Sequence, residues 1–448
     1  MAKSHSTIED LVRGWKQRGI THVQFELPDM HGVSRSKIVP LGHVESYATG
    51  GLNMYGGTVS LDTASSVVPN TLYNEEVNYA DQLLRPDLGT ALDVPWLENT
   101  ARLICEGEWE DGTPHRAAPR WLLRQLLDRA DSMGYEVKVG LEYEFYIFDP
   151  DKADPDPYFG GLHIFNTLRN RYVPVIDRIL DEMPRAGVDI ITANCEYAPS
   201  QFEINFAPAI GIDAADQGFT FKNGVKTIAH QMGYNATFMT KPLPEDAANG
   251  CHIHLSLSDK TTGANAFLDN DDPDGLSAVA RQFIQGMLDH TPASMALLAP
   301  TINCYSRFVP HHFPPSNVSW GPQDRSAAVR AKNSRDDNTH LENRLGTGLA
   351  NPYLAVAGVL ATGLLGLEKG VPAVTPDPSA GPVEDDPQYT KLPATLEESL
   401  AALEADGEFA GMLGEEFVTV YTVMRRHELA RFRAHITDWE KSEYLEIY

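Results

Sequence analysis

The order of hydrophobic and polar residues along the chain predicts two differently built regions. Residues 7–18 have the spacing of a short amphipathic helix, and the next segment, THVQFELPDMHG, alternates like a strand that ends in a turn. The segment SRSKIVP, residues 34–40, follows as the predicted hairpin partner. Residues 40–100 are rich in Gly, Thr, Asn and Pro, with short apolar segments between them. This composition indicates a small sheet with long loops.

A different pattern begins after the segment PHRAAP at residues 114–119. RWLLRQLLDRADSMGY has apolar residues at helical spacing, and the strand-like EVKVGLEYEFYIF follows it. Further on, helical segments such as Ala278–Leu298 alternate with strand-like runs such as SQFEINFAP and NGCHIHLSL. We therefore predict an α+β protein with two domains, residues 1–113 and residues 114–448.

The composition is that of a globular protein and restricts its partners. Of 448 residues, 36 are Lys or Arg and 62 are Asp or Glu, a formal net charge of −26. Such an acidic chain is a poor candidate for binding nucleic-acid phosphates or anionic membranes. The apolar stretch Leu354–Leu367 is short for a bilayer and contains glycines, so we expect a buried helix there. The four cysteines form no CxxC pair and no signal peptide is visible, so we expect a cytoplasmic protein.

Carboxylates recur on the same face of two predicted strands. In GLEYEF, Glu142 and Glu144 alternate with apolar neighbours, so both side chains point to one side of the strand. In EYAPSQFEINF, Glu203 lies on the polar face of the strand and Glu196 precedes the turn. Each pattern alone is also typical of a strand face in contact with water. Neighbouring carboxylates repel each other unless a cation binds between them, so a metal site is the alternative.

Histidine and arginine residues extend this set of candidates. His252 lies in GCHIHLSL, although a single HxH is often a matter of packing or hydrogen bonding. Glu342 and Arg344 alternate on one predicted strand. The other arginines of this region, each also explained by a surface salt bridge, are Arg307, Arg325, Arg330 and Arg335.

Together these residues fit phosphoryl transfer from ATP. Carboxylates and an imidazole bind divalent cations, and guanidinium groups bind phosphate and carboxylate groups. Such groups neutralise the charge that moves in a phosphoryl transfer. The chain has no GxxxxGK[ST] motif, so its nucleotide site would be of another type.

In this order the motifs resemble those of the glutamine synthetase family, over residues 10–448. GLEYEF is similar to the family's GxExEF strand, GCHIHLSL to its GMHxHxSL, and EYAPSQFEI to its E…GQxE element, with Ser200 in place of the usual Gly. NCYSRFVP, DRSAAVR, LENRLGTGLANPYL and RFRAHITDWEKSEY match further family segments in order. The resemblance implies a small N-terminal β-grasp-like domain and a large catalytic domain with a curved antiparallel sheet. It also implies homo-oligomers of stacked rings, usually dodecamers, with active sites between subunits.

The resemblance assigns roles to individual residues. It implies ATP and two divalent metals, Mg²⁺ or Mn²⁺, as cofactors of one site. One metal would be bound by Glu144, Glu196 and Glu203, and the metal on the ATP phosphates by Glu142, His252 and Glu342. Glutamate would be bound by Gly250, Arg307 and Arg344. ATP would be bound by Ser256, Arg325 and Arg330. The four arginines of these two sets would also be the catalytic residues. A further nucleotide-binding arginine of the family has no clear match, because His340 occupies its place, and Arg335 is the alternative.

Two departures from the family pattern concern the amine. Members that use ammonia have an acidic residue in a flap after the RLVP segment and a second one in the N-terminal domain, where this chain has Phe313 and Tyr55. A small cation needs negative charge in order to leave water, so this loss weakens an ammonium site. The rings can attract an alkylammonium or stack on an arylamine. His311 or His312 can accept the proton of an amine that arrives charged.

We therefore expect a ligase that joins glutamate to an organic amine, an alkylamine such as methylamine or an arylamine, through γ-glutamyl phosphate. An ammonia-using glutamine synthetase is the first alternative, if another acidic residue serves. A catalytically inactive structural or regulatory member is the second, which the presence of all six metal ligands disfavours. The segment DDPQYT, residues 385–390, matches poorly the tyrosine segment that some family members adenylylate, so we predict no such control.

Overall fold

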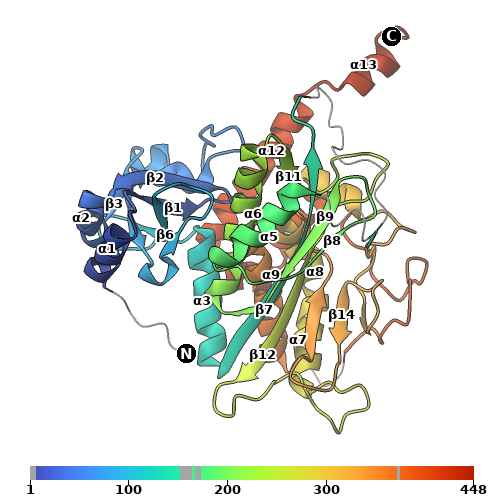
Figure 1. The fold of residues 1–448 in the computed structure, drawn as a ribbon. Helices are drawn as coiled ribbons and strands as arrows, with labels where there is room; N and C mark the ends of the chain where they lie inside the picture. Colours follow the sequence, from blue (N-terminus) through green and yellow to red (C-terminus); the bar gives the residue numbers. More distant parts are fainter. Residues whose placement is uncertain (1–6, 152–163, 167–172, 371–373) are drawn as a thin grey trace.

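Two β-sheets organise the chain, a small one near the N-terminus and a large one that carries most of the candidate residues (Figure 1). The computed structural model describes residues 7–151, 164–166, 173–370 and 374–448. The mixture of helices and sheets confirms the α+β class. The boundary predicted between residues 113 and 114 falls between strand β6 (Thr100–Glu108) and helix α3 (Pro119–Ser132), and as a domain boundary it stays a prediction.

The small sheet has the strand order β2-β1-β6-β4-β3, and β5 pairs with β6. Its other strands are β1 (His22–Pro28), β2 (Ser34–Pro40), β3 (Leu52–Tyr55), β4 (Asp81–Pro86) and β5 (Leu92–Asp93). β1 and β2 pair antiparallel, which confirms the predicted hairpin, and β1 pairs parallel with β6. Helix α1 (Ile8–Gln17), also predicted, begins where the Thr7 side chain accepts a hydrogen bond from the Asp10 backbone. Helix α2 (Leu41–Gly50) packs against α1 and the sheet.

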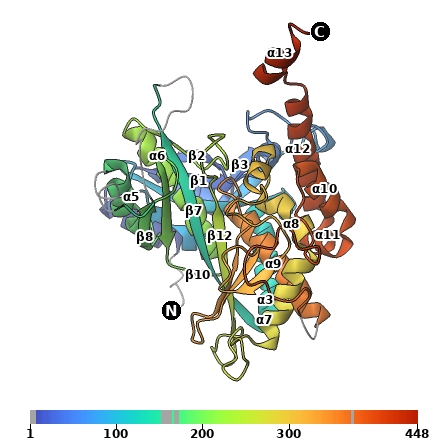
Figure 2. The same cartoon turned by 90° about the vertical axis from the view of Figure 1, so that its right-hand side faces the viewer.

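The large sheet has the order β13-β14-β15-β12-β7-β9-β8, and β10 and β11 also pair with β7. Figure 2 shows the long central strands β7 and β12 side by side. The strands are β7 (Tyr135–Phe148), β8 (Ile190–Cys195), β9 (Gln201–Phe206), β10 (Ala209–Ile210), β11 (Asn235–Thr237), β12 (Cys251–Asp259), β13 (Trp320–Pro322), β14 (Val329–Lys332) and β15 (His340–Asn343). All pairs except β13–β14 are antiparallel.

Helices cover one face of the large sheet, and this leaves the other face for polar side chains. Along β7 the apolar residues are buried and the polar residues between them are partly exposed. Helix α9 (Pro352–Lys369) is buried from Pro352 to Gly366, which confirms the buried helix expected there. No helix of the described ranges is long and apolar enough to cross a membrane. The other helices are α5 (Pro174–Arg185), α6 (Ile212–Gln231), α7 (Ala278–Asp289), α8 (Thr291–Leu298), α10 (Leu396–Ala405), α11 (Gly407–Leu413), α12 (Glu415–Arg433) and α13 (Asp438–Tyr444).

One predicted helix is in fact two. The segment Ala278–Leu298 has continuous helical spacing, but α7 ends at Asp289 and α8 begins at Thr291. Pro292 occupies the first turn of α8, where its missing backbone N–H is harmless. In an uninterrupted helix the same proline would remove a hydrogen bond and clash with the carbonyl four residues earlier. The apolar spacing alone does not show this break.

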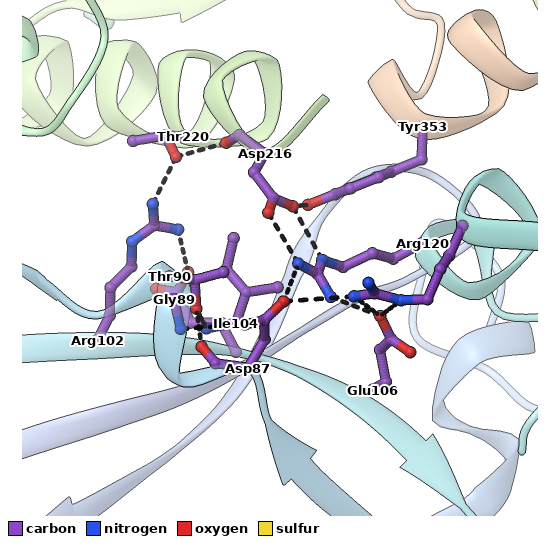
Figure 3. Close-up of polar contacts among 12 residues, drawn as sticks. Asp87, Gly89, Thr90, Arg102, Ile104, Glu106, Arg120, Asp216, Thr220 and Tyr353 are labelled. Atoms are coloured by element: carbon purple, nitrogen blue, oxygen red, sulfur yellow. Dashed lines mark hydrogen bonds and ion pairs between the residues drawn. The ribbon is translucent and has the colours of Figure 1, made fainter. Parts of the chain in front are cut away.

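A buried arginine joins the two sheets through the helices (Figure 3). Arg120 on α3 is 1% exposed, and its Nε and Nη2 donate to the two carboxylate oxygens of Asp216 on α6 at 2.9 Å each. Its Nη2 also donates to Asp87 at 2.8 Å, and its Nη1 to Glu106 on β6. The Tyr353 hydroxyl on α9 donates to Asp216 at 2.6 Å. Because buried charges are stable only when paired, this network holds the small sheet against the helices.

Replacement of Arg120 by leucine should therefore destabilise the protein strongly. The change leaves the buried carboxylate of Asp216 without its cation, at an expected cost of roughly 3–5 kcal/mol, whereas Asp87 and Glu106 keep their ion pairs with Arg124. Urea unfolding followed by tryptophan fluorescence, at one protein concentration, measures the loss. The control is Arg13→Ala, which removes an exposed pair with Asp10 and should cost at most about 1 kcal/mol. Equal losses in the two variants would contradict a structural role for the network.

Candidate active site

Antiparallel pairing brings the predicted ligands together on the open face of the large sheet. Glu142 on β7 lies opposite His252 on β12, and Glu144 lies opposite Glu203 on β9. Glu196 directly follows β8, and its backbone N–H donates to the Gln201 carbonyl, closing the turn into β9. Directly opposed residues point to the same face of a sheet. Strands that are far apart in the sequence therefore place their polar side chains side by side.

The first group consists of Glu142, His252 and Glu342. His252 Nδ1 donates to Glu142 Oε1 at 2.7 Å and lies 4.0 Å from Glu342 Oε1. Arg330 Nη1 donates to Glu342 Oε2 at 3.0 Å, and Arg344 donates to Glu342 Oε1. Burial alone would raise the pKa of Glu342, but the nearby histidines and Arg344 lower it to about 2. These carboxylates are therefore ionised and balanced by positive charge.

The second group, Glu144, Glu196 and Glu203, lacks this balance. Burial and the charge of Glu144 raise the pKa of Glu196 to about 7. Burial and the charges of Glu142, Glu144 and Glu196 raise the pKa of Glu203 to about 9. The backbone N–H of Gly250 donates to Glu144 Oε2 at 2.6 Å. Ionising all three carboxylates together is therefore unfavourable, and a bound divalent cation would favour their ionised forms.

The donor set fits a divalent metal, although the side chains are not yet arranged around one. Within the described ranges, no three His, Cys, Asp or Glu residues form a ready-made metal cluster. The carboxylates accept hydrogen bonds from neighbouring amides instead: Asn194 donates to Glu196 at 2.9 Å and Asn205 to Glu203 at 3.1 Å. The Asn205 Oδ1 atom is buried and has no hydrogen-bond partner among the described residues. Carboxylate and amide oxygens with one imidazole are ligands that Mg²⁺ and Mn²⁺ accept.

A cavity of about 1040 Å³ opens onto the same face of the sheet. Seven of the predicted site residues line it: Glu144, Glu196, His252, Arg307, His312, Phe313 and Arg344. Phe313 is 61% exposed, and the Arg344 guanidinium carbon lies 5.7 Å from the centre of its ring. Glutamate-binding, metal-binding and flap candidates thus meet in one cavity.

Three arginines keep buried donors unused at this site. The Nε atoms of Arg307, Arg330 and Arg344 are buried and have no hydrogen-bond partner in the part of the chain that the structure describes. Arg307 Nη1 donates to the Ala248 carbonyl at 3.3 Å, and burial lowers the Arg307 pKa below its usual value. Unsatisfied buried donors are costly. They are explained if carboxylate or phosphate oxygens of a substrate bind here.

Three predicted nucleotide contacts lie in a second, smaller cavity or outside both cavities. Ser256 lines a cavity of about 110 Å³ together with His254 and His340, whose rings lie within hydrogen-bond distance at 3.0 Å. Arg335 donates instead to backbone carbonyls of residues 270–273, so it faces a loop. Arg325 is exposed in the turn between β13 and β14. Its role in ATP binding stays a prediction.

Tyr55 and His311 are not brought to the cavity in a single chain. Tyr55 ends strand β3, and its hydroxyl donates to Asn74 within the small sheet region. His311 is exposed in the segment after Arg307, but it is not among the lining residues. A contribution of Tyr55 to an amine pocket therefore requires the active site of a neighbouring subunit. That arrangement is implied by the family resemblance.

The sequence analysis missed the segment 241–248, which forms one wall of the cavity. Lys241 and Asn303 fix its start, because the Lys241 backbone N–H donates to Asn303 Oδ1 at 2.8 Å and Asn303 donates back to the Lys241 carbonyl at 2.9 Å. Tyr197, 64% exposed, was missed as well. Two features of the sequence could have indicated these residues. One is the segment KPLPED between two predicted strands, and the other is the position of Tyr197 directly after the predicted ligand Glu196.

Comparison with known proteins gives the family. The family model for the catalytic domain of glutamine synthetase matches residues 116–444. A γ-glutamylethanolamide synthetase of Streptomyces coelicolor is 36% identical, over 94% of this chain and 92% of its own length. A glutamine synthetase of Halobacterium salinarum is 31% identical, over 96% of this chain and 95% of its own length. A solved ADP complex of the protein GmaS matches with a TM-score of 0.85 at 30% identity, covering 98% of this chain and 99% of that one.

The chain therefore belongs to the glutamine synthetase family. With that membership it is an ATP-dependent carbon–nitrogen ligase, and the use of a nucleotide and of divalent metal follows. Its relatives include both a glutamine synthetase and a γ-glutamylethanolamide synthetase. The amine that this chain uses is a separate question.

Replacement of Glu203 by glutamine tests whether the carboxylates of the second group destabilise the metal-free protein. In protein freed of metal by a chelator, Glu203→Gln should raise the unfolding free energy by about 1 kcal/mol, because it removes a carboxylate that three others repel. Added Mg²⁺ or Mn²⁺ should stabilise the wild type more than this variant. Thermal unfolding with and without metal gives both numbers. Glu136→Gln, at the exposed end of β7, is the matched control. An equal metal response in all three proteins would exclude Glu203 as a ligand.

Proposed function

We propose that the protein is a γ-glutamylamide ligase that joins glutamate to an organic amine at the expense of ATP. The observation that carries this proposal is Phe313, which lines the catalytic cavity where ammonia-using relatives have an acidic flap residue. A phenyl ring at this place has no net charge to attract ammonium, but the alkyl or aryl group of an organic amine can pack against it. The resemblance of the chain to a γ-glutamylethanolamide synthetase supports the same reading.

The first step would activate glutamate. A γ-carboxylate oxygen attacks the γ-phosphorus of ATP, the bond to the β,γ-bridging oxygen breaks, and ADP leaves. Arg307 and Arg344 would hold the carboxylates of glutamate, with the backbone at Gly250. Arg330, paired with Glu342 at 3.0 Å, would present its guanidinium to the phosphate groups, and Arg325 would assist from the turn.

The second step would form the amide. The amine nitrogen attacks the γ-carbonyl carbon of γ-glutamyl phosphate, inorganic phosphate leaves, and the nitrogen gives up a proton. An amine that arrives as a cation must lose a further proton before it attacks. His312 lines the cavity and is the acceptor that we assign to this proton.

Two divalent metals would complete the site. Glu144, Glu196 and Glu203 would hold one, and Glu142, His252 and Glu342 the other. When bound, such metals neutralise the negative charge on the phosphate oxygens. The protein's part is to fix these six side chains on one face of a rigid sheet.

We also propose that the active enzyme is a ring oligomer, a dodecamer if it follows its family. Tyr55 would then reach the amine pocket of the neighbouring subunit. The small sheet region that carries Tyr55 is held to the catalytic helices through Arg120 and Asp216. A stable attachment of this kind is needed if one subunit is to complete the site of the next.

An amine panel tests the function directly. Release of phosphate is measured with ATP, Mg²⁺ or Mn²⁺ and glutamate, and ammonium is compared with methylamine, isopropylamine, ethanolamine, a diamine and aniline. An organic amine should exceed ammonium in kcat/KM by at least about tenfold, which corresponds to about 1.4 kcal/mol of preferential transition-state binding. A preference for ammonium over every organic amine would identify a glutamine synthetase instead.

Phe313→Glu should shift this preference toward ammonium. The variant returns a carboxylate to the flap, so kcat/KM for ammonium relative to the best organic amine should rise about tenfold or more. Phe313→Leu, which removes the ring without adding charge, is the control and should weaken the organic amine without improving ammonium. An unchanged ratio in the glutamate variant would show that residue 313 does not select the amine.

A further inference from the structure

Two exposed aromatic side chains line the same cavity as the proposed catalytic groups. Tyr197 is 64% exposed and Phe313 is 61% exposed, and both line the cavity. They come from different parts of the fold, Tyr197 from the turn between β8 and β9 and Phe313 from the segment after Arg307. Exposed rings in a cavity are typical of a binding surface for an organic group.

The cavity that an amine would enter is lined by positively charged side chains as well as by carboxylates. Lys241, Arg307 and Arg344 all line the cavity, and Arg344 lies over the Phe313 ring. These groups suit the anionic substrates, but they repel an ammonium ion. The cation–π attraction of Phe313, worth about 0.5–2 kcal/mol, is partly used by Arg344. An amine that carries a charge therefore needs a carboxylate of its own in the cavity.

Glu245 is such a carboxylate. It lies on the segment 241–248 and lines the cavity together with Tyr197 and Phe313. It is exposed, and across the described ranges its carboxylate has no hydrogen bond and no ion pair. Of the other carboxylates that line the cavity, those of Glu144 and Glu196 are proposed metal ligands and would be neutralised by the metal. The remaining one, Asp246, directly follows Glu245 and is less exposed.

The segment that carries Glu245 is anchored on both sides. The ammonium group of Lys241 donates to the Asp246 carbonyl, and the Tyr146 hydroxyl donates to the Ala247 carbonyl at 2.6 Å. Gln201 Nε2 donates to the Ala248 carbonyl at 3.3 Å. The backbone after Glu245 is thus tied to β7, β9 and the start of the segment, which Asn303 fixes at Lys241. A carboxylate on an anchored segment can select a substrate by position.

We propose that Glu245, Tyr197 and Phe313 form the amine subsite and that its substrate class is a protonated aliphatic amine. This inference rests on the proposed function and sharpens it. The carboxylate of Glu245 binds the ammonium group, and the two rings pack against the carbon body. An arylamine is uncharged at neutral pH and would gain nothing from Glu245. Glu245 would supply the negative charge that is missing from the flap, where this chain has Phe313 in place of an acidic residue.

Glu245→Gln tests the charge at nearly constant size. Kinetics with methylamine and isopropylamine, which are cations at neutral pH, are compared with hydroxylamine, which is a neutral nucleophile there. The variant should lose about tenfold or more in kcat/KM for the two alkylamines, mainly through KM, and less than about twofold for hydroxylamine. KM for glutamate and ATP should stay within about twofold. Glu245→Asp should recover part of the loss, since it restores the charge.

Controls separate this role from a structural one. Glu110→Gln removes an exposed carboxylate outside the cavity and should change no kinetic constant. Tyr197→Ala should lower kcat/KM for isopropylamine more than for methylamine, because the larger alkyl group loses more contact.

If Glu245→Gln lowers alkylamine and hydroxylamine activity equally, or lowers neither, the proposed subsite is wrong while the ligase function stands. If the wild-type enzyme prefers aniline, the proposed substrate class is wrong. A wild-type preference for ammonium would instead overturn the proposed function itself.

Discussion

The crowding of negative charge on one face of the large sheet is the constraint on which the rest of the structure depends. Glu142, Glu144 and Glu203 occupy neighbouring positions on paired strands, and their mutual repulsion, with burial, raises the pKa of Glu203 to about 9. Such an arrangement is unfavourable unless the strands are held firmly from behind. The buried helix α9 and its neighbours provide this support, since they pack on the apolar face of the same strands. Stability supplied by the core is thus used to hold carboxylates where a cation can bind.

The same argument applies to the positive groups. Arg307, Arg330 and Arg344 each keep a buried Nε donor without a partner among the described residues, at a cost that an anionic ligand would remove. Carboxylates on β7 and β9 lie on the same side of the sheet as arginines contributed by β14, by the residue after β15 and by the segment before the flap. The site therefore places cation-binding and anion-binding groups side by side, and they meet at Glu342, which pairs with Arg330 and Arg344. This arrangement suits a reaction between two anions, ATP and glutamate, that must be brought together against their repulsion.

Local patterns predicted the strands well, because alternation is a property of each strand alone. Alternation placed Glu142 and Glu144 on one face of β7, and likewise Gln201, Glu203 and Asn205 on one face of β9. The hairpin of β1 and β2 was predicted from the turn between the two strands. Which strand lies beside which depends on long-range packing, so pattern alone predicted neither the pairing of Glu142 with His252 nor that of Arg335 with the 270–273 loop. The break at Pro292 and the wall formed by residues 241–248 were missed for related reasons. The helical spacing of apolar residues continues through Pro292, so it does not show the break. The 241–248 segment is a loop, and a loop has no periodic pattern from which its position could be predicted.

The choice of amine depends on where negative charge remains once the metals and anions are bound. Metals would neutralise Glu144 and Glu196, and Glu342 is already paired with Arg330 and Arg344. Of the carboxylates that line the large cavity, those of Glu245 and Asp246 are then left to face an incoming substrate. A flap with an acidic residue would add to this charge and favour the smallest cation. With Phe313 in the flap, the proposed subsite keeps its charge on the 241–248 segment and offers a ring beside it, so it would suit an amine with both a positive end and an apolar part.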